Sequence, residues 1–137
     1  MRNVLVVDDD DTIRGLLVEA LGERAHVTVE AARDGIEALH LLSSQHYQVI
    51  VLDVMMPKMS GVDLLESLQA MLSDSSFKPL ATPPAAIVIT AAAASALPNA
   101  VFEGRFPTLV RAVFRKPLDM TVLAELVEKL LGEAAPR

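Results

Sequence analysis

Short apolar runs alternate along this chain with segments that have helical spacing. The runs are rich in Val, Ile and Ala, and each contains three or four residues: 4–7, 27–29, 49–52, 86–89 and 112–114. Short, mostly β-branched runs of this kind are typical of strands that are buried on both faces of a sheet. The alternation therefore predicts an α/β domain, in which helices cover both faces of a parallel sheet.

The segments between these runs carry apolar residues three and four positions apart, as amphipathic helices do. The first predicted stripe is Ile13, Leu16, Leu17, Ala20 and Leu21. A second, beginning at Ile36, follows the turn pair Asp34-Gly35; a third includes 62–72; the last includes 120–131, with Asp119 as its N-cap and Gly132 beyond its end. Together with an irregular helix before the fifth strand, which Pro98, Gly104 and Pro107 would interrupt, we expect five helices.

Composition narrows the class of protein. A chain of 137 residues with 52% hydrophobic residues fits one globular domain, predicted over 1–132 with a tail at 133–137. It contains no cysteine, which excludes disulfides and thiolate metal sites. A net charge of −6 without a basic cluster disfavours direct nucleic-acid binding. No apolar run approaches the roughly 20 residues that span a membrane, and a cytoplasmic protein is expected.

Chemically reactive side chains stand at the ends of the predicted strands. Asp8 and Asp9 follow the first strand, Asp53 ends the third, Thr90 ends the fourth, and Lys116 follows the fifth. Ligands of open parallel sheets bind beyond this edge, so these groups should converge there. Two carboxylates about 4 Å apart repel by roughly 1 kcal/mol in water and about 4 kcal/mol at an effective dielectric constant of 20. A hard cation such as Mg²⁺ would relieve this repulsion.

These residues, with "LDVMMPKMSG" (52–61), "AARDGIEAL" (31–39), Thr90-Ala91 and Lys116-Pro117, resemble the receiver domains of two-component response regulators. The resemblance covers nearly the whole chain. It implies a flavodoxin-like, doubly wound sheet of five parallel strands in the order 2-1-3-4-5. It also implies a cis peptide bond between Lys116 and Pro117.

The resemblance assigns a role to each site residue. Asp53 would accept a phosphoryl group from a sensor histidine kinase or a phosphotransfer protein, and the domain would switch protein contacts rather than act as an enzyme. Mg²⁺ would be held by Asp9, Asp53 and the main-chain carbonyl of Met55, with Asp8 acting chiefly through water. The phosphoryl oxygens would be bound by Thr90, Ala91 and Lys116.

Two further sets of positions follow from the same resemblance. Thr90 and Val113 occupy the switch positions, but Val113 replaces the usual aromatic residue, and a β-branched valine cannot swing as a tyrosine does. We therefore expect a remodelled output face of helix 4, strand 5 and helix 5, which would contact the downstream protein. Met55 and Ala92 occupy positions that tune dephosphorylation. Neither can hold a water molecule by hydrogen bonding, so slow self-dephosphorylation is expected.

Two alternatives stay open at this point. "VLVVDDDDTI" (4–13) also fits the D-x-D-x-T pattern of haloacid-dehalogenase phosphatases, with Asp8 as nucleophile, Asp10 as general acid/base and Thr12 in register. That family needs a further acidic pair after the lysine, and only isolated acids follow Lys116. The other alternative is a receiver-shaped interaction module that is never phosphorylated. The sequence does not identify the kinase, the target or the oligomeric state.

Overall fold

The computed structural model describes residues 2–23, 27–54, 56, 59–73, 83–90 and 104–134. These contain a parallel sheet with the strand order β2-β1-β3-β4-β5, as the resemblance implied. The strands are β1 (Arg2–Val7), β2 (Val27–Ala32), β3 (Val49–Asp53), β4 (Ala85–Thr90) and β5 (Val110–Arg115). The described helices are α1 (Asp11–Gly22), α2 (Gly35–Ser44), α3 (Gly61–Leu72) and α5 (Met120–Ala134).

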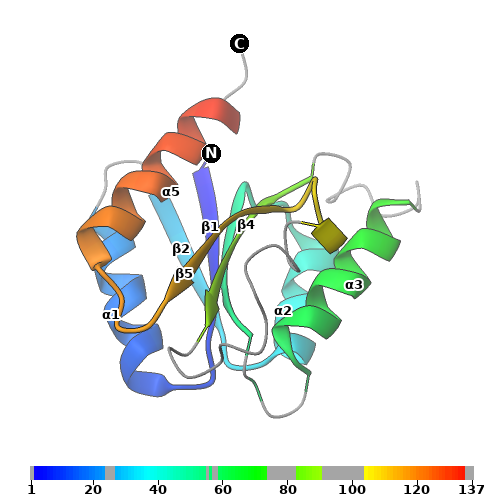
Figure 1. The fold of residues 1–137 in the computed structure, drawn as a ribbon, viewed down its shortest axis with the longest axis horizontal. Helices are drawn as coiled ribbons and strands as arrows, with labels where there is room; N and C mark the ends of the chain where they lie inside the picture. The colour runs from blue at the N-terminus through cyan, green and yellow to red at the C-terminus, as the bar shows by residue number, and fades with distance from the viewer. Residues whose placement is uncertain are drawn as a thin grey trace.

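The sheet separates two hydrophobic cores. Helices α1 and α5 cover one face, and α2 and α3 cover the other (Figure 1). Successive strand residues alternate between the cores: Val4 and Val6 face α1 and α5, whereas Leu5 and Val7 face α2 and α3. Because side chains in a strand point alternately to opposite faces, a sheet covered on both sides needs unbroken apolar runs. This explains why the sequence shows such runs rather than an alternating pattern.

Acidic and hydroxyl side chains cap the helices. Asp10 accepts hydrogen bonds from the main-chain N–H groups of Thr12 and Ile13 at the start of α1. Asp119 does the same at the start of α5, which confirms its predicted role as N-cap. Ser60 caps α3 in the same way. Caps of this kind stabilise a helix by about 1 kcal/mol each. Asp10 therefore has a structural role, separate from the acids on either side of it.

Two expectations for the helices differ from the structure, and a third falls largely outside the described residues. Leu16 and Ile36 belong to the predicted apolar stripes, yet they have exposed fractions of 50% and 56%. The buried side of α1 is narrower than its apolar stripe, with Leu17 and Leu21 in the core. Helix α5 does not end before Gly132 but continues to Ala134, where Glu133 forms an ion pair with Arg111 of β5 at 2.9 Å. Four helices lie entirely within the described residues; the expected irregular fourth helix falls largely in 91–103, outside them, and only Gly104 and Arg105 next to this segment are described as helical.

Two further observations bear on the sequence-based expectations. The peptide bond between Lys116 and Pro117 is cis, as expected. Among the helices of the described part of the chain, none combines the length and the apolar character needed to cross a membrane.

Gly61 begins α3 where that helix touches the end of β3. A Cβ atom on Gly61 would lie 2.7 Å from Cδ1 of Leu52, 2.8 Å from the main-chain oxygen of Asp53 and 2.8 Å from the Cα of Val54. The N–H of Gly61 donates a hydrogen bond to the Val54 carbonyl at 2.9 Å. Two of the three contacts are main chain and cannot rotate away. A glycine is therefore required here, eight residues after Asp53.

We expect Gly61→Ala to lower the free energy of unfolding by about 2 kcal/mol, because the added methyl group must displace the main chain of β3. Gly15→Ala is the matched control, since a Cβ at this helical glycine of α1 would meet no described atom within 4 Å apart from its own helix backbone. That control should raise the free energy of unfolding by about 0.5–1 kcal/mol. Urea denaturation measures both changes. Equal effects of the two substitutions would contradict the close contact at Gly61.

Candidate functional site

The ends of β1 and β3 bring three carboxylates together. The two strands are neighbours, with Val7 paired to Leu52, so the residues that follow Val7 lie beside Asp53. One carboxylate oxygen from each of Asp8, Asp9 and Asp53 lies within 4.8 Å of the others. The chain leaves β1 toward β2 on one side and returns to β3 on the other, so this is the point where the strand order reverses. Open α/β sheets bind ligands at such points.

Asp8 is fully buried, although it carries a carboxylate. Its Oδ1 accepts a hydrogen bond from the main-chain N–H of Asp10 at 2.9 Å, whereas its Oδ2 has no hydrogen-bond partner among the described residues. Burial, followed by the negative charges of Asp53 and Asp9, raises the pKa of Asp8 from 3.8 to about 6, against the lowering effects of the Asp10 N–H and Lys116. Asp9, in contrast, is exposed.

Lys116 joins the end of β5 to this acidic cluster. Its Nζ donates a hydrogen bond to Oδ2 of Asp53 at 3.0 Å, and its main-chain N–H donates to the Thr90 carbonyl at 2.9 Å. Burial works to lower the pKa of Lys116, but the bond to Asp53 and the charges of Asp53, Asp8 and Asp10 raise it overall. The amine is therefore held in its charged form beside Asp53, where it neutralises part of the cluster.

Thr90 contributes a second unsatisfied oxygen to the same edge. The residue is buried at the end of β4, and its hydroxyl has no hydrogen-bond partner among the described residues. Buried polar groups are almost always paired, so two unpaired oxygens at one sheet edge require an explanation. Oδ2 of Asp8 can coordinate a hard cation, and the Thr90 hydroxyl can donate to an oxyanion. The donor set, all oxygen with three carboxylates, fits Mg²⁺.

Of the remaining predicted positions, only Val113 is among the described residues. Val113 lies half-buried on β5, opposite Val88, and packs against the core beneath α2 and α3. Met55, Ala91 and Ala92 lie outside the described residues, so their expected roles stay predictions.

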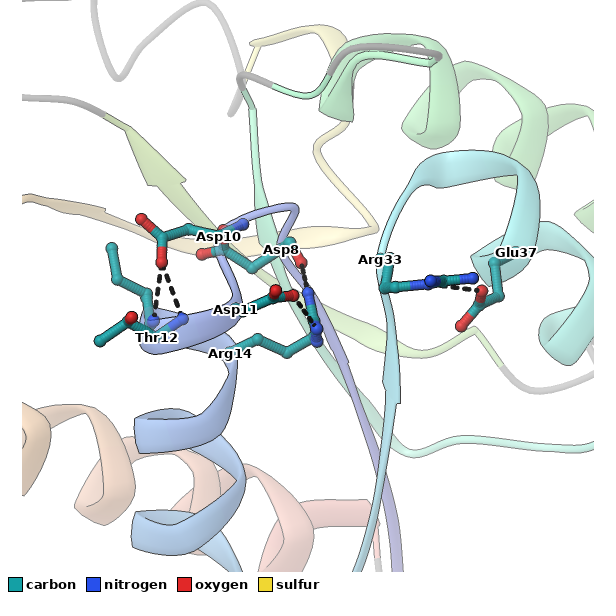
Figure 2. A network of polar contacts seen from close by, with 8 residues as sticks. Asp8, Asp10, Asp11, Thr12, Arg14, Arg33 and Glu37 are labelled. Atoms are coloured by element: carbon teal, nitrogen blue, oxygen red, sulfur yellow. Dashed lines mark hydrogen bonds and ion pairs between the residues drawn. The ribbon is translucent and has the colours of Figure 1, made fainter.

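One residue at this edge was missed by the sequence analysis. Figure 2 shows Arg14 of α1 reaching back to the turn after β1, where its Nη1 donates a hydrogen bond to the main-chain oxygen of Asp8 at 2.9 Å. Its Nη2 pairs with Asp11. The available signal was the spacing of Asp11 and Arg14, three positions apart on a helix, which favours an ion pair.

Comparison with known proteins identifies the class of domain that this fold and site define. Residues 4–128 match the family model of the response regulator receiver domain. The chain belongs to this family. It is 42% identical over 67 residues to the response regulator MprA of Mycobacterium ulcerans; the alignment covers 49% of this chain and 28% of that protein. The chain thus matches less than a third of that relative's length.

Solved structures agree with this assignment. The receiver domain of Francisella response regulator 1452 has a TM-score of 0.78 and 25% sequence identity, with coverage of 98% of this chain and 100% of that one. The response regulator TrrA of Thermotoga maritima, solved in complex with Mg²⁺-BeF, has a TM-score of 0.73 and 28% identity, covering 95% of this chain and 99% of that one. Nothing in these comparisons supports the haloacid-dehalogenase alternative.

Proposed function

We propose that this receiver domain accepts a phosphoryl group on Asp53 from a phosphohistidine of a sensor histidine kinase or a phosphotransfer protein. One observation carries the proposal. The carboxylates of Asp8, Asp9 and Asp53 cluster within 4.8 Å, and the amine of Lys116 stands 3.0 Å from Asp53. Asp53 is buried at the sheet edge, beside the acids of the proposed cation site and the Lys116 amine, and carboxylates can act as covalent nucleophiles.

The cation site is proposed to consist of Asp8, Asp9, Asp53 and the main-chain carbonyl of Met55, with Asp8 acting chiefly through water. When bound, Mg²⁺ would neutralise negative charge on the carboxylates and on the phosphoryl oxygens. Oδ2 of Asp8, for which the described residues supply no donor, supports this assignment, because a buried carboxylate oxygen without a donor gains most from a cation.

The transfer itself needs little covalent chemistry from the protein. An oxygen of Asp53 forms a bond to phosphorus as the bond from phosphorus to the donor imidazole nitrogen breaks, and the pair of electrons returns to that nitrogen. Lys116 stabilises the negative charge of the transferring group. Asp53 is then the substrate of the reaction, and the domain acts as a phosphoryl acceptor rather than as an enzyme with multiple turnover.

Phosphorylation is proposed to act on the output face through Thr90. Its hydroxyl, which has no hydrogen-bond partner in the described part of the chain, would together with the main chain of Ala91 bond the new phosphoryl oxygens. One neutral hydrogen bond contributes about 1 kcal/mol. Shifting the ratio of the active to the inactive conformation from 1:99 to 99:1 needs about 5.5 kcal/mol. The contacts of the phosphoryl group with Lys116 and with a bound cation would therefore have to supply part of this free energy. Binding of the downstream protein would complete the shift.

Several finer assignments follow from the same role. We place the exchange in the cytoplasm, without direct nucleic-acid contacts of the domain, and we assign the face of helix 4, β5 and α5 to the downstream protein. Val113 sits at the second switch position with little rotational freedom. Met55 and Ala92 cannot orient a hydrolytic water, so the phosphorylated state should be long-lived.

The proposal is tested by incubating the protein with acetyl phosphate and Mg²⁺ and measuring its intact mass. One phosphoryl group should be gained, and the gain should disappear with a chelator or in Asp53→Asn. Asp63→Asn, which changes an exposed capping acid of α3, is the matched control and should be labelled like the native protein. Label on Asp8, or sustained release of phosphate, would support the phosphatase alternative. Absence of label would support an interaction module that is not phosphorylated.

A further inference from the structure

The peptide unit between Asp8 and Asp9 is held in place by a side chain. Nη1 of Arg14 donates to the main-chain oxygen of Asp8 at 2.9 Å (Figure 2). The peptide is planar, so fixing its carbonyl fixes ψ of Asp8 and φ of Asp9 together. These two angles set how the Cα–Cβ bonds of Asp8 and Asp9 are oriented relative to this peptide plane, and the two carboxylates extend from those bonds.

The guanidinium of Arg14 is itself held on its other side. Its Nη2 pairs with Asp11, whose side chain is 86% exposed, whereas the Arg14 side chain is only 16% exposed. A planar guanidinium with several donors can bridge two acceptors in a defined orientation, which an ammonium does poorly. Arg14 thus links the first turn of α1 to the peptide unit that precedes it.

This arrangement gives the four consecutive acids different tasks. Asp10 caps α1, Asp11 orients Arg14, and Asp8 and Asp9 join Asp53 in the cluster. The positive charge of Arg14 is balanced by Asp11, so the link adds little net charge near the cluster.

We infer that Arg14 is a positioning residue for the cation site, which orients Asp8 and Asp9 through the peptide unit between them. This inference rests on the proposed function, since it concerns the same Mg²⁺. It adds that the affinity of the site depends on a residue that does not touch the ion.

Two effects of removing Arg14 have opposite signs, which makes the inference testable. Loss of a positive charge near the acids would strengthen cation binding, but Asp11 already balances most of the charge of Arg14, so this effect should be small. Loss of the link would free the peptide unit and weaken cation binding. Substitution of groups that orient metal ligands lowers affinity by about 10–100-fold, so the weakening should dominate.

The test is a Mg²⁺ titration of the 137-residue protein, followed by the NMR amide signals of residues 8–10. Arg14→Gln should weaken Mg²⁺ binding about tenfold. Arg33→Gln is the charge-matched control, because Arg33 is exposed and pairs with Glu37 at 3.6 Å, on a different loop (Figure 2). It should change the affinity by less than about twofold, and only at low salt.

Two further variants separate position from charge. Arg14→Lys keeps the charge but loses the two-armed bridge, and it should recover only part of the affinity. It also serves in place of Arg14→Gln if that variant does not fold, as judged by a thermal melt. Asp11→Asn keeps the donor to the Asp8 carbonyl and should weaken binding less than Arg14→Gln does.

The outcomes are distinguishable. If the native protein binds Mg²⁺ and Arg14→Gln binds it equally or more tightly, the positioning role is wrong and the proposed function stands. The same holds if Arg14→Gln and Arg33→Gln behave alike. If the native protein does not bind Mg²⁺, the proposed cation site fails, and this inference fails with it.

Discussion

Asp8→Asn should raise the free energy of unfolding of the metal-free protein by about 2 kcal/mol at pH 7.5, while weakening Mg²⁺ binding. The carboxylate of Asp8 is fully buried, and Oδ2 has no hydrogen-bond partner among the described residues. A shift of its pKa from 3.8 to about 6 corresponds to about 3 kcal/mol of destabilisation when the group is charged. Asparagine removes the charge and keeps an acceptor for the Asp10 N–H, but it buries an amide, so part of the gain is lost.

The pH dependence has a definite sign. A raised carboxyl pKa means that the folded state binds a proton more tightly than the unfolded state does. Between pH 3.8 and about 6, the stability contributed by protonated Asp8 is therefore lost as the pH rises. Urea denaturation in a chelator, repeated at pH 5 and pH 7.5, should show this fall in the native protein and a smaller one in Asp8→Asn.

Asp9→Asn is the matched control for this experiment. Asp9 belongs to the same cluster, but its side chain is exposed, so water already solvates its charge. Its substitution should weaken Mg²⁺ binding with little change in the stability of the metal-free protein. An equal gain in stability from both substitutions would show that mutual repulsion, rather than burial of Asp8, limits stability. No gain from either would contradict the raised pKa of Asp8.

Such a gain would mean that the site is maintained at the expense of stability. Charged groups that a cation must reach cannot all be paired within the protein. These unpaired charges destabilise the folded state until the ion binds. Mg²⁺ should accordingly stabilise the native protein by mass action, because it binds the folded state and not the unfolded one.

The sequence predicted the sheet well because one physical pattern determines it. Unbroken apolar runs require burial on both faces, and strand ends then place Asp8, Asp9, Asp53 and Lys116 at one edge. Because β1, β3, β4 and β5 are parallel, their carboxyl ends lie at the same edge of the sheet, and the reactive side chains at those ends come together there.

What the sequence could not predict depends on side-chain geometry across the fold. Leu16 and Ile36 fit a helical apolar stripe, but how much of a stripe is buried depends on how the helix sits on the sheet. Gly132 is a common helix stop, yet the pair formed by Glu133 and Arg111 lies beyond it, and α5 continues. The bond from Arg14 to the Asp8 carbonyl has no sequence signature at all, because a main-chain acceptor can belong to any residue.

Lys116→Met should lower the free energy of unfolding of the metal-free protein by about 2 kcal/mol, the opposite sign to Asp8→Asn. Removal of one partner of a buried ion pair costs about 3–5 kcal/mol, and the 26% exposure of the Lys116 side chain reduces this value. Asp53, whose side chain is 4% exposed, would lose the hydrogen bond that this amine donates to it. Lys129→Met, on the exposed side of α5, is the matched control and should change stability by less than about 0.5 kcal/mol.

A double-mutant cycle isolates the pair. If the loss in Lys116→Met comes from the carboxylate of Asp53, the same substitution in an Asp53→Asn background should cost less, with a coupling free energy of about 1–2 kcal/mol. Burial shields the pair from salt, so this coupling should persist at high ionic strength, where surface pairs fade. Full additivity of the two substitutions would contradict the 3.0 Å contact as the source of stability. A coupling that disappears in salt would place the amine in solvent, where it could not stabilise charge on a phosphoryl group at Asp53.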